Sequence, residues 1–158
     1  MLFDRYLSAD RIAAAASVVA SLDCDFILTA RTEGFAYGIA DMDETLARLD
    51  LFSSAGADVL YAPGMTDLSL IRELCAHFKK PINVLTGFRG MNATFEELEA
   101  LGVKRISVGT QLSRIAYGAL VRSAEHLFQN HSVGPYEVDV RSSEIVRRLQ
   151  QKLESHSL

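Results

Sequence analysis

The chain of 158 residues alternates four times between a helical pattern and a short apolar run, and this repetition is the feature that most restricts its fold. Each run follows a helical segment and ends in a polar residue or a glycine. We expect strands at residues 26–30, 58–62, 81–85 and 105–108. Short apolar runs of this kind are typical of strands in a buried parallel sheet. The sequence therefore predicts an α/β fold with right-handed crossovers.

The helical segments carry recognisable start and stop signals. Asp41 is followed three residues later by Glu44, and Thr94 by Glu97, which is the spacing of a capping box. Ser8 or Asp10 can cap the first helix, and Thr66 the third. The expected helices lie at about residues 8–22, 41–56, 66–78, 94–102, 111–128 and 142–153, and in the fifth of them Leu112, Ile115, Ala116, Ala119, Leu120, Ser123 and Leu127 are expected to form a buried side.

Four βα units suit either a small open sheet or half of a TIM (β/α)8 barrel. A whole barrel needs roughly 200 to 250 residues, which is more than this chain has. Short strands whose following loops all converge favour the half-barrel. We therefore expect residues 1–130 to form half of a TIM barrel with a leading helix, and residues 131–158 to form a linker and a C-terminal amphipathic helix.

The composition of the chain restricts the partners and the cellular compartment that we expect for it. The chain is 49% hydrophobic and 23% charged, with a net charge of -4 and no run of like charge, so neither nucleic acid nor a membrane is an expected partner. The start lacks a basic signal region, and the longest apolar stretch, residues 12–22, is too short to span a bilayer. Cys24 and Cys75 lack metal-ligand spacing and are expected to be reduced thiols of a cytoplasmic protein.

Arg31 and Glu33 come directly after the first predicted strand. In parallel α/β folds the carboxyl ends of the strands hold the chemistry, so both side chains are expected at the rim of a shared pocket. The guanidinium of Arg31 suits bidentate binding of a carboxylate or phosphate, and the alternative is that it anchors its loop. Glu33 is a candidate base, or else a residue that pairs with Arg31 and pins the loop.

The other strand ends offer fewer reactive groups. Ser107 lies near the end of the fourth strand and Gly109 directly after it. Both could contact a phosphate, although a glycine there also simply permits a tight turn. Glu33 is the one carboxylate at the four strand ends, so a magnesium site is not expected on this chain. Every lysine falls at a strand start or on a helix, which disfavours a Schiff-base aldolase.

Five segments together resemble the phosphoenolpyruvate mutase/isocitrate lyase superfamily, in unbroken register from about Asp4 to Ala124. They are residues 26–33 (FILTARTE), 46–64 (LARLDLFSSAGADVLYAPG), 80–85 (KPINVL), 101–109 (LGVKRISVG) and 113–120 (SRIAYGAL). The resemblance implies strands five to eight of a (β/α)8 barrel. It also implies Mg²⁺-dependent cleavage or formation of C–C or P–C bonds in small 2-oxo or 2-hydroxy carboxylates, through an enolate.

The resemblance implies roles for several residues, and it also shows where this chain differs from the family. Arg31 falls on the strand-five arginine that contacts substrate, and Asn83, Ser107 and Gly109 are further candidates for substrate binding, with Glu33 the candidate catalytic residue. Lyase members carry a glutamate where this chain has Pro63, and an asparagine where it has Leu85. The family's metal-binding carboxylates lie on strands three and four, which this chain lacks. Mg²⁺ is therefore expected for the whole enzyme and not from residues of this chain.

Two hypotheses follow. In the first, the chain is the C-terminal half of a lyase or mutase of this family and is inactive alone. It is then either a truncated product or a chain that functions with a separate N-terminal half-barrel. In the second, it is a non-catalytic half-barrel remnant that self-associates through its open strand edges. In the resembled family a C-terminal helix crosses to a neighbouring barrel, so the helix at 142–153 could make a homo-oligomer, or else dock on its own chain.

Overall fold

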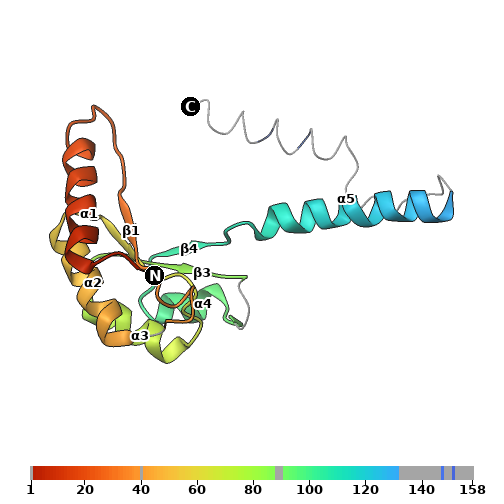
Figure 1. The fold of residues 1–158 in the computed structure, drawn as a ribbon. Coiled ribbons are helices and arrows are strands. Elements are labelled where there is room, and N and C mark those ends of the chain that lie inside the picture. Colours follow the sequence, from red (N-terminus) through yellow and green to blue (C-terminus); the bar gives the residue numbers. More distant parts are fainter. Residues whose placement is uncertain (1, 40, 88–90, 132–146, 148–150, 152–158) are drawn as a thin grey trace. The chain divides into compact units, whose positions relative to one another are not determined.

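The computed structural model describes residues 2–39, 41–87, 91–131, 147 and 151. The chain divides into two compact units, Met1–Leu112 and Ser113–Leu158, and each is treated by itself. Figure 1 shows the first unit as a small sheet with helices packed beside it.

The sheet of the first unit has four parallel strands in the order β1-β2-β3-β4. The strands are β1 (Thr29–Arg31), β2 (Val59–Tyr61), β3 (Ile82–Leu85) and β4 (Arg105–Ser107). Because the order follows the sequence without reversal, right-handed crossovers place the connecting helices on one face, as in a barrel. The predicted strands are confirmed in order and type, but the first is shorter, since Phe26 and Ile27 lie exposed before it.

Four helices of this unit begin at side-chain caps. They are α1 (Arg5–Val19), α2 (Met42–Ser54), α3 (Leu68–His77) and α4 (Phe95–Ala100). Asp41 and Thr94 cap their helices as the sequence predicts, and Thr94 and Glu97 form the complete capping box. The box predicted for Asp41 is only half formed, because the carboxylate of Glu44 pairs with Arg5 and Arg48. The first and third helices were predicted with the wrong caps. Asp4 and Asp67 cap them because their carboxylates accept backbone N–H groups in the first turn.

The hydrophobic core lies between one face of the sheet and helices α2 to α4. Alternate strand residues point into it, because neighbouring side chains on a strand face opposite ways. Its members include Ala30, Leu60, Ile82 and Val84 from the strands and Leu49, Phe52, Ile71, Leu74 and Leu98 from the helices. The helix α1 contacts α2, but none of its residues is fully buried.

The opposite face of the sheet carries a row of polar side chains. Register places Arg31 beside Tyr61, Tyr61 beside Asn83, and Asn83 beside Arg105, one residue from each strand. Their neighbours in the strands point into the core, so these four side chains share the face that would line the inside of a barrel.

The second unit consists mainly of α5 (Gln111–Asn130) among the residues described. The prediction of a buried side on this helix is wrong. The structure buries none of its residues, and Ile115 and Leu120 are 59% and 63% exposed. The amphipathic pattern is present within the helix itself, which has apolar residues such as Leu112 and Val121 on it. The helix predicted at 142–153 lies almost wholly outside the described residues, where only positions 147 and 151 are seen, both helical. Within the described part of the chain no helix is long and apolar enough to cross a membrane.

Truncating the core should destabilise the first unit far more than truncating the outer side of α1. Leu49 is fully buried and Leu7 is 49% exposed. We expect Leu49→Ala to lower the free energy of unfolding by about 2–5 kcal/mol, because it leaves a cavity. Leu7→Ala, the matched control, should change it by less than about 0.5 kcal/mol. Urea denaturation followed by circular dichroism measures both, and equal effects would contradict the core assignment.

Candidate functional site

Arg31 and Glu33 meet where β1 ends. The Nε of Arg31 is hydrogen-bonded to Oε1 of Glu33, and the two side chains are 57% and 27% exposed. The Glu33 carboxylate raises the pKa of Arg31, partly offset by burial. The pairing engages Nε and leaves the outer guanidinium nitrogens of Arg31 without a hydrogen bond among the residues described. Those nitrogens are the ones suited to an anionic ligand.

Tyr61 lies next to Arg31 on the same face. The guanidinium carbon of Arg31 is 5.7 Å from the centroid of the Tyr61 ring, a cation–π distance. Burial raises the pKa of Tyr61, whereas the side chain of Ser107 and the charges of Arg31 and Arg105 lower it. The ring therefore supports the guanidinium from one side, and the hydroxyl belongs to the polar face.

Ser107 and Asn83 continue this polar face across β3 and β4. The Nδ2 of Asn83 donates to Oγ of Ser107 at 3.1 Å, and that hydroxyl donates to the backbone carbonyl of Val84 at 3.3 Å. Asn83 is only 2% exposed, and its Oδ1 has no hydrogen-bond partner within the described part of the chain. In this arrangement Asn83 acts through Ser107, and its assignment to substrate binding remains a prediction.

Gly109 follows Ser107 by two residues, in the turn before α5. Its φ of +52° lies in the left-handed region that favours glycine. A Cβ there would also lie 3.1 Å from Cδ1 of Leu85. The turn conformation accounts for this glycine, so its predicted contact with a ligand has no separate support. The structure thus joins Arg31, Glu33, Asn83 and Ser107 through Tyr61, with Gly109 at the margin.

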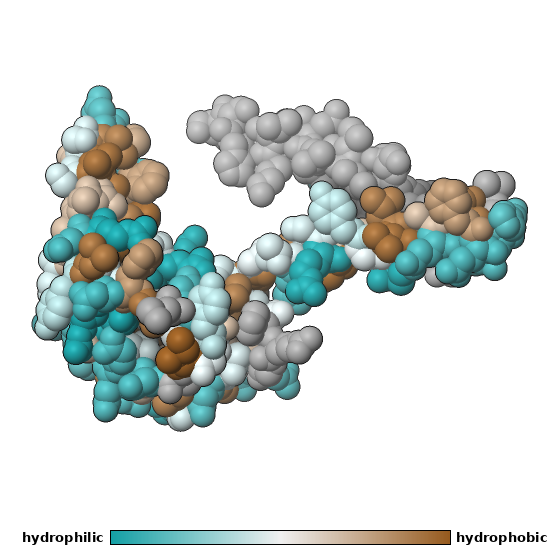
Figure 2. Space-filling model, in the orientation of Figure 1, coloured by the Kyte–Doolittle hydropathy of each residue, from teal (hydrophilic) through white to brown (hydrophobic). Residues whose placement is uncertain are grey.

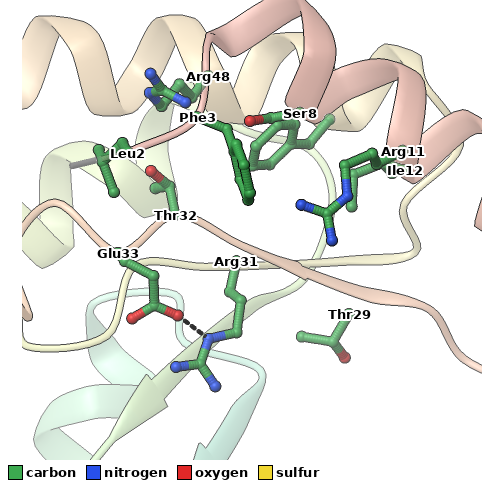
Figure 3. A pocket seen from close by; sticks show the side chains of 11 residues that line it. Leu2, Phe3, Ser8, Arg11, Ile12, Thr29, Arg31, Thr32, Glu33 and Arg48 are labelled. Atoms are coloured by element: carbon green, nitrogen blue, oxygen red, sulfur yellow. Dashed lines mark hydrogen bonds and ion pairs between the residues drawn. The ribbon is translucent and has the colours of Figure 1, made fainter.

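A pocket of about 420 Å³ opens beside β1. Figure 3 shows Arg31, Glu33 and Thr29 on one side of it and Phe3 and Arg11 on the other. The remaining walls come from the N-terminal segment, α1 and α2, and no residue of β2 contributes. The pocket therefore lies along the edge of β1 that faces away from β2.

The residues of this region do not fit a divalent metal. Among residues 2–39, 41–87 and 91–131, no group of three or more His, Cys, Asp or Glu side chains could hold an ion. Glu33, the carboxylate closest to the site, is already paired with Arg31. A hard cation such as Mg²⁺ needs several converging oxygens. No chemical step is therefore assigned to a metal held by this part of the chain.

Comparison with known proteins decides the family. Residues 1–128 match the family model described as phosphoenolpyruvate phosphomutase. The chain belongs to this family. It is also 30% identical, over 119 residues, to 2-methylisocitrate lyase of Escherichia coli (strain K12), a match that covers 75% of this chain and 38% of the lyase.

Solved structures agree with the family fold. The chain is 41% identical to a protein of Burkholderia cenocepacia J2315 described as a lyase/mutase, with a TM-score of 0.85 over 92% of this chain and 52% of that one. A 2,3-dimethylmalate lyase of the phosphoenolpyruvate mutase/isocitrate lyase superfamily shares 21% identity and has a TM-score of 0.78, covering all of this chain and 57% of the lyase. The chain thus spans about half the length of these solved relatives. The resemblance read from the sequence and the half-barrel fold are confirmed.

Tyr61 is the site residue that sequence reasoning missed. The alternation within Val59, Leu60 and Tyr61 places it on the face opposite the buried Leu60. Register with Arg31 then sets the two side by side. The alternation of side chains along the strand could have indicated that Tyr61 faces away from the core. However, an aromatic residue in a strand suggests core packing more readily than a binding site.

The raised pKa of Tyr61 predicts a specific loss of stability in alkali. In the folded state the pKa of Tyr61 lies above its ordinary value of 10.0. The contribution of this shift to stability is therefore fully present below pH 10.0, and it is lost as the pH rises through the folded-state pKa. We expect the wild type to lose more stability than Tyr61→Phe above pH 10.0. Denaturant titrations of both proteins across this range, with Tyr117→Phe as the exposed-tyrosine control, measure the difference. Parallel curves for wild type and Tyr61→Phe would contradict it.

Proposed function

We propose that this chain supplies the substrate-binding half of a Mg²⁺-dependent lyase or mutase that makes or breaks C–C or P–C bonds in small 2-oxo or 2-hydroxy carboxylates. Arg31 would hold a carboxylate of the substrate. The complementary half of the barrel would hold the metal. On this proposal the chain is inactive alone.

The observation that carries the proposal is the position of Arg31 and the contacts that hold its side chain. Its guanidinium stands at the carboxyl end of β1, braced by Glu33 and by the ring of Tyr61, with more than half of the side chain exposed. A cation fixed on two sides and open on a third is preorganised for an anion, which lowers the cost of ordering it on binding. Neighbours of the same fold act in their descriptions on such anions, among them oxaloacetate and phosphonopyruvate.

On this proposal the metal is bound by the other half of the barrel. One fold neighbour, a phosphonopyruvate hydrolase, is described in complex with oxalate and Mg²⁺. When bound, such an ion would stabilise the enolate. The part of this chain described here provides a cation for the anionic substrate, the guanidinium of Arg31, with a hydroxyl and an amide behind it. Its own contribution is to bind and orient the substrate carboxylate.

The test compares the purified chain alone with the chain mixed with a complementary barrel half. The matching source is the part of the Burkholderia cenocepacia relative that lies outside the region matched here. Turnover of 2-methylisocitrate, 2,3-dimethylmalate, oxaloacetate and phosphonopyruvate is measured with Mg²⁺ and again with EDTA. Activity that needs both halves and Mg²⁺ supports the proposal. A well-folded assembly that turns over none of the four would favour the non-catalytic, self-associating alternative.

Arg31 should be the most sensitive position on this half. We expect Arg31→Ala to lower kcat/KM of the assembled enzyme by about 10- to 150-fold, the equivalent of a hydrogen bond to a charged group. Arg31→Lys keeps the charge but not the planar fork, so it should recover only part of the loss. Arg72→Ala removes an exposed arginine of α3 and is the control. If Arg31→Ala matches Arg72→Ala, Arg31 is only a loop anchor.

A further inference from the structure

We propose that Tyr61 is a specificity-determining residue of the candidate site, whose phenolic O–H donates to a second oxygen of a small acid that Arg31 holds by its carboxylate. The group recognised by Tyr61 is then a neutral oxo or hydroxyl oxygen next to that carboxylate. Ser107 is a positioning residue that orients the phenol. The inference rests on the proposed function, because it names the part of the substrate that this half recognises besides the carboxylate.

Tyr61 is the nearest neighbour of Arg31 in the row of polar side chains across the sheet. The two residues are register partners on β1 and β2, and the guanidinium carbon of Arg31 lies 5.7 Å from the centroid of the Tyr61 ring. Neighbouring strands lie about 4.8 Å apart. One small molecule can therefore touch the outer guanidinium nitrogens of Arg31 and the hydroxyl of Tyr61 at the same time.

The other cation of this row is too distant to share such a ligand. Arg105 lies on β4, three strands along from Arg31, and at about 4.8 Å per strand the two residues are about 14 Å apart. A small 2-oxo or 2-hydroxy acid is shorter than this distance. The group beside Arg31 in the row is thus a neutral hydrogen-bond donor, which suits an oxo or hydroxyl oxygen better than a second carboxylate.

Ser107 turns the phenolic proton of Tyr61 toward the ligand. The hydroxyl of Ser107 has one proton, which it shares between the Val84 carbonyl at 3.3 Å and the phenolic oxygen of Tyr61. When Ser107 donates to the phenolic oxygen, it gives up only the longer bond to Val84. The phenol then has its own proton free, pointing away from Ser107, and a ligand oxygen can accept it.

Asn83 fixes the direction of this chain of hydrogen bonds. It is only 2% exposed, and its Nδ2, which can only donate, lies 3.1 Å from Oγ of Ser107. The oxygen of Ser107 therefore accepts from Asn83, and its proton is left for Val84 or Tyr61. Hydrogen bonds that run the same way along such a chain strengthen one another. The phenol at its end is a better donor than an isolated tyrosine.

The polar row is separate from the exposed apolar surface of the first unit. Leu7 and Val18 of α1 are 49% and 62% exposed, and Figure 2 shows brown surface over this helix. The strands offer instead a guanidinium, a phenol, a hydroxyl and an amide. A ligand on the row is therefore held by charge and hydrogen bonds more than by apolar contact, which fits a small polar acid.

The experiment measures the binding of two acids of similar shape to the full chain by NMR titration in EDTA. Pyruvate carries an oxygen beside its carboxylate, and isobutyrate carries a methyl group in that place. The wild type should bind pyruvate about 3- to 10-fold more tightly than isobutyrate, the size of one neutral hydrogen bond. Tyr61→Phe should abolish this preference and leave isobutyrate binding unchanged. Arg31→Ala should weaken the binding of both acids.

Two further tyrosines serve as comparisons. Tyr117→Phe alters a tyrosine of α5 that is 67% exposed, and it should keep the preference. Tyr37→Phe alters the loop between β1 and α2. Loss of the preference in Tyr37→Phe but not in Tyr61→Phe would overturn the proposal and assign the second contact to that loop. A wild type that binds both acids equally, or neither, also overturns it. Circular dichroism checks that each variant is folded.

The positioning role of Ser107 has a spectroscopic test. Burial raises the pKa of Tyr61 and the side chain of Ser107 lowers it, so Ser107→Ala should raise that pKa further and reduce the preference for pyruvate. Ser107→Thr keeps the hydroxyl and should retain both properties. The signal of ring-labelled tyrosine in carbon-13 NMR follows the ionisation. An unchanged pKa of Tyr61 in Ser107→Ala would remove Ser107 from this role.

Turnover by the two barrel halves together judges the proposed function separately. A preference for pyruvate that depends on Tyr61, without turnover by the assembled halves, keeps this inference and removes the activity. Turnover by the assembled halves, with a preference that survives Tyr61→Phe, keeps the activity and removes the role of Tyr61.

Discussion

The first unit depends on a parallel sheet that its described helices cover on one face only. Parallel strands are normally buried on both faces, because their crossovers bring helices to each side or close the sheet into a barrel. Here the sequential strand order puts α2, α3 and α4 over one face, where Leu49, Leu60, Ile71 and Leu98 form the core. The other face is left to the polar row from Arg31 to Arg105. Within this row Arg31 is more than half exposed, whereas Asn83 is almost fully buried.

The same row is also an incomplete polar network. Asn83 is almost fully buried, yet its Oδ1 finds no hydrogen-bond partner within the described residues. A buried acceptor without a partner is costly and uncommon in a finished interior. Since Nδ2 of Asn83 is committed to Ser107, and Ser107 is committed to Val84, the network cannot repair itself by a simple hydroxyl rotation. Closure of the barrel, or water, must satisfy this oxygen.

Local sequence signals predicted most of the fold. Capping residues such as Asp41 and Thr94, and the short apolar runs, fixed the order and type of every strand and helix described in the first unit. Packing was harder. The stripe on α5 was expected to be buried because amphipathicity implies a partner surface, but the pattern does not say which chain supplies it. For the same reason Phe26 and Ile27 looked like strand interior and are exposed.

The candidate site shows the same difference between what local sequence signals predict and what packing decides. Arg31 and Glu33 could be proposed from the sequence because they stand at a strand end, a position readable from one segment. Tyr61 was missed because its role comes from register with a strand thirty residues away, and the role of Asn83 changed because its contact with Ser107 crosses to β4. Long-range register is set by the packed core and the crossovers together. It cannot be read from any single run of residues.

Charge distribution relates the candidate site to the proposed function. A metal-dependent site for anionic substrates needs carboxylates for the ion and cations for the substrate. The described residues place Arg31 and Arg105 in one row across the sheet, and no group of three or more His, Cys, Asp or Glu side chains among them could hold an ion. On the proposed function, the carboxylates for the ion would therefore come from the other half of the barrel, and the two kinds of charge that the reaction needs would meet only in the closed barrel.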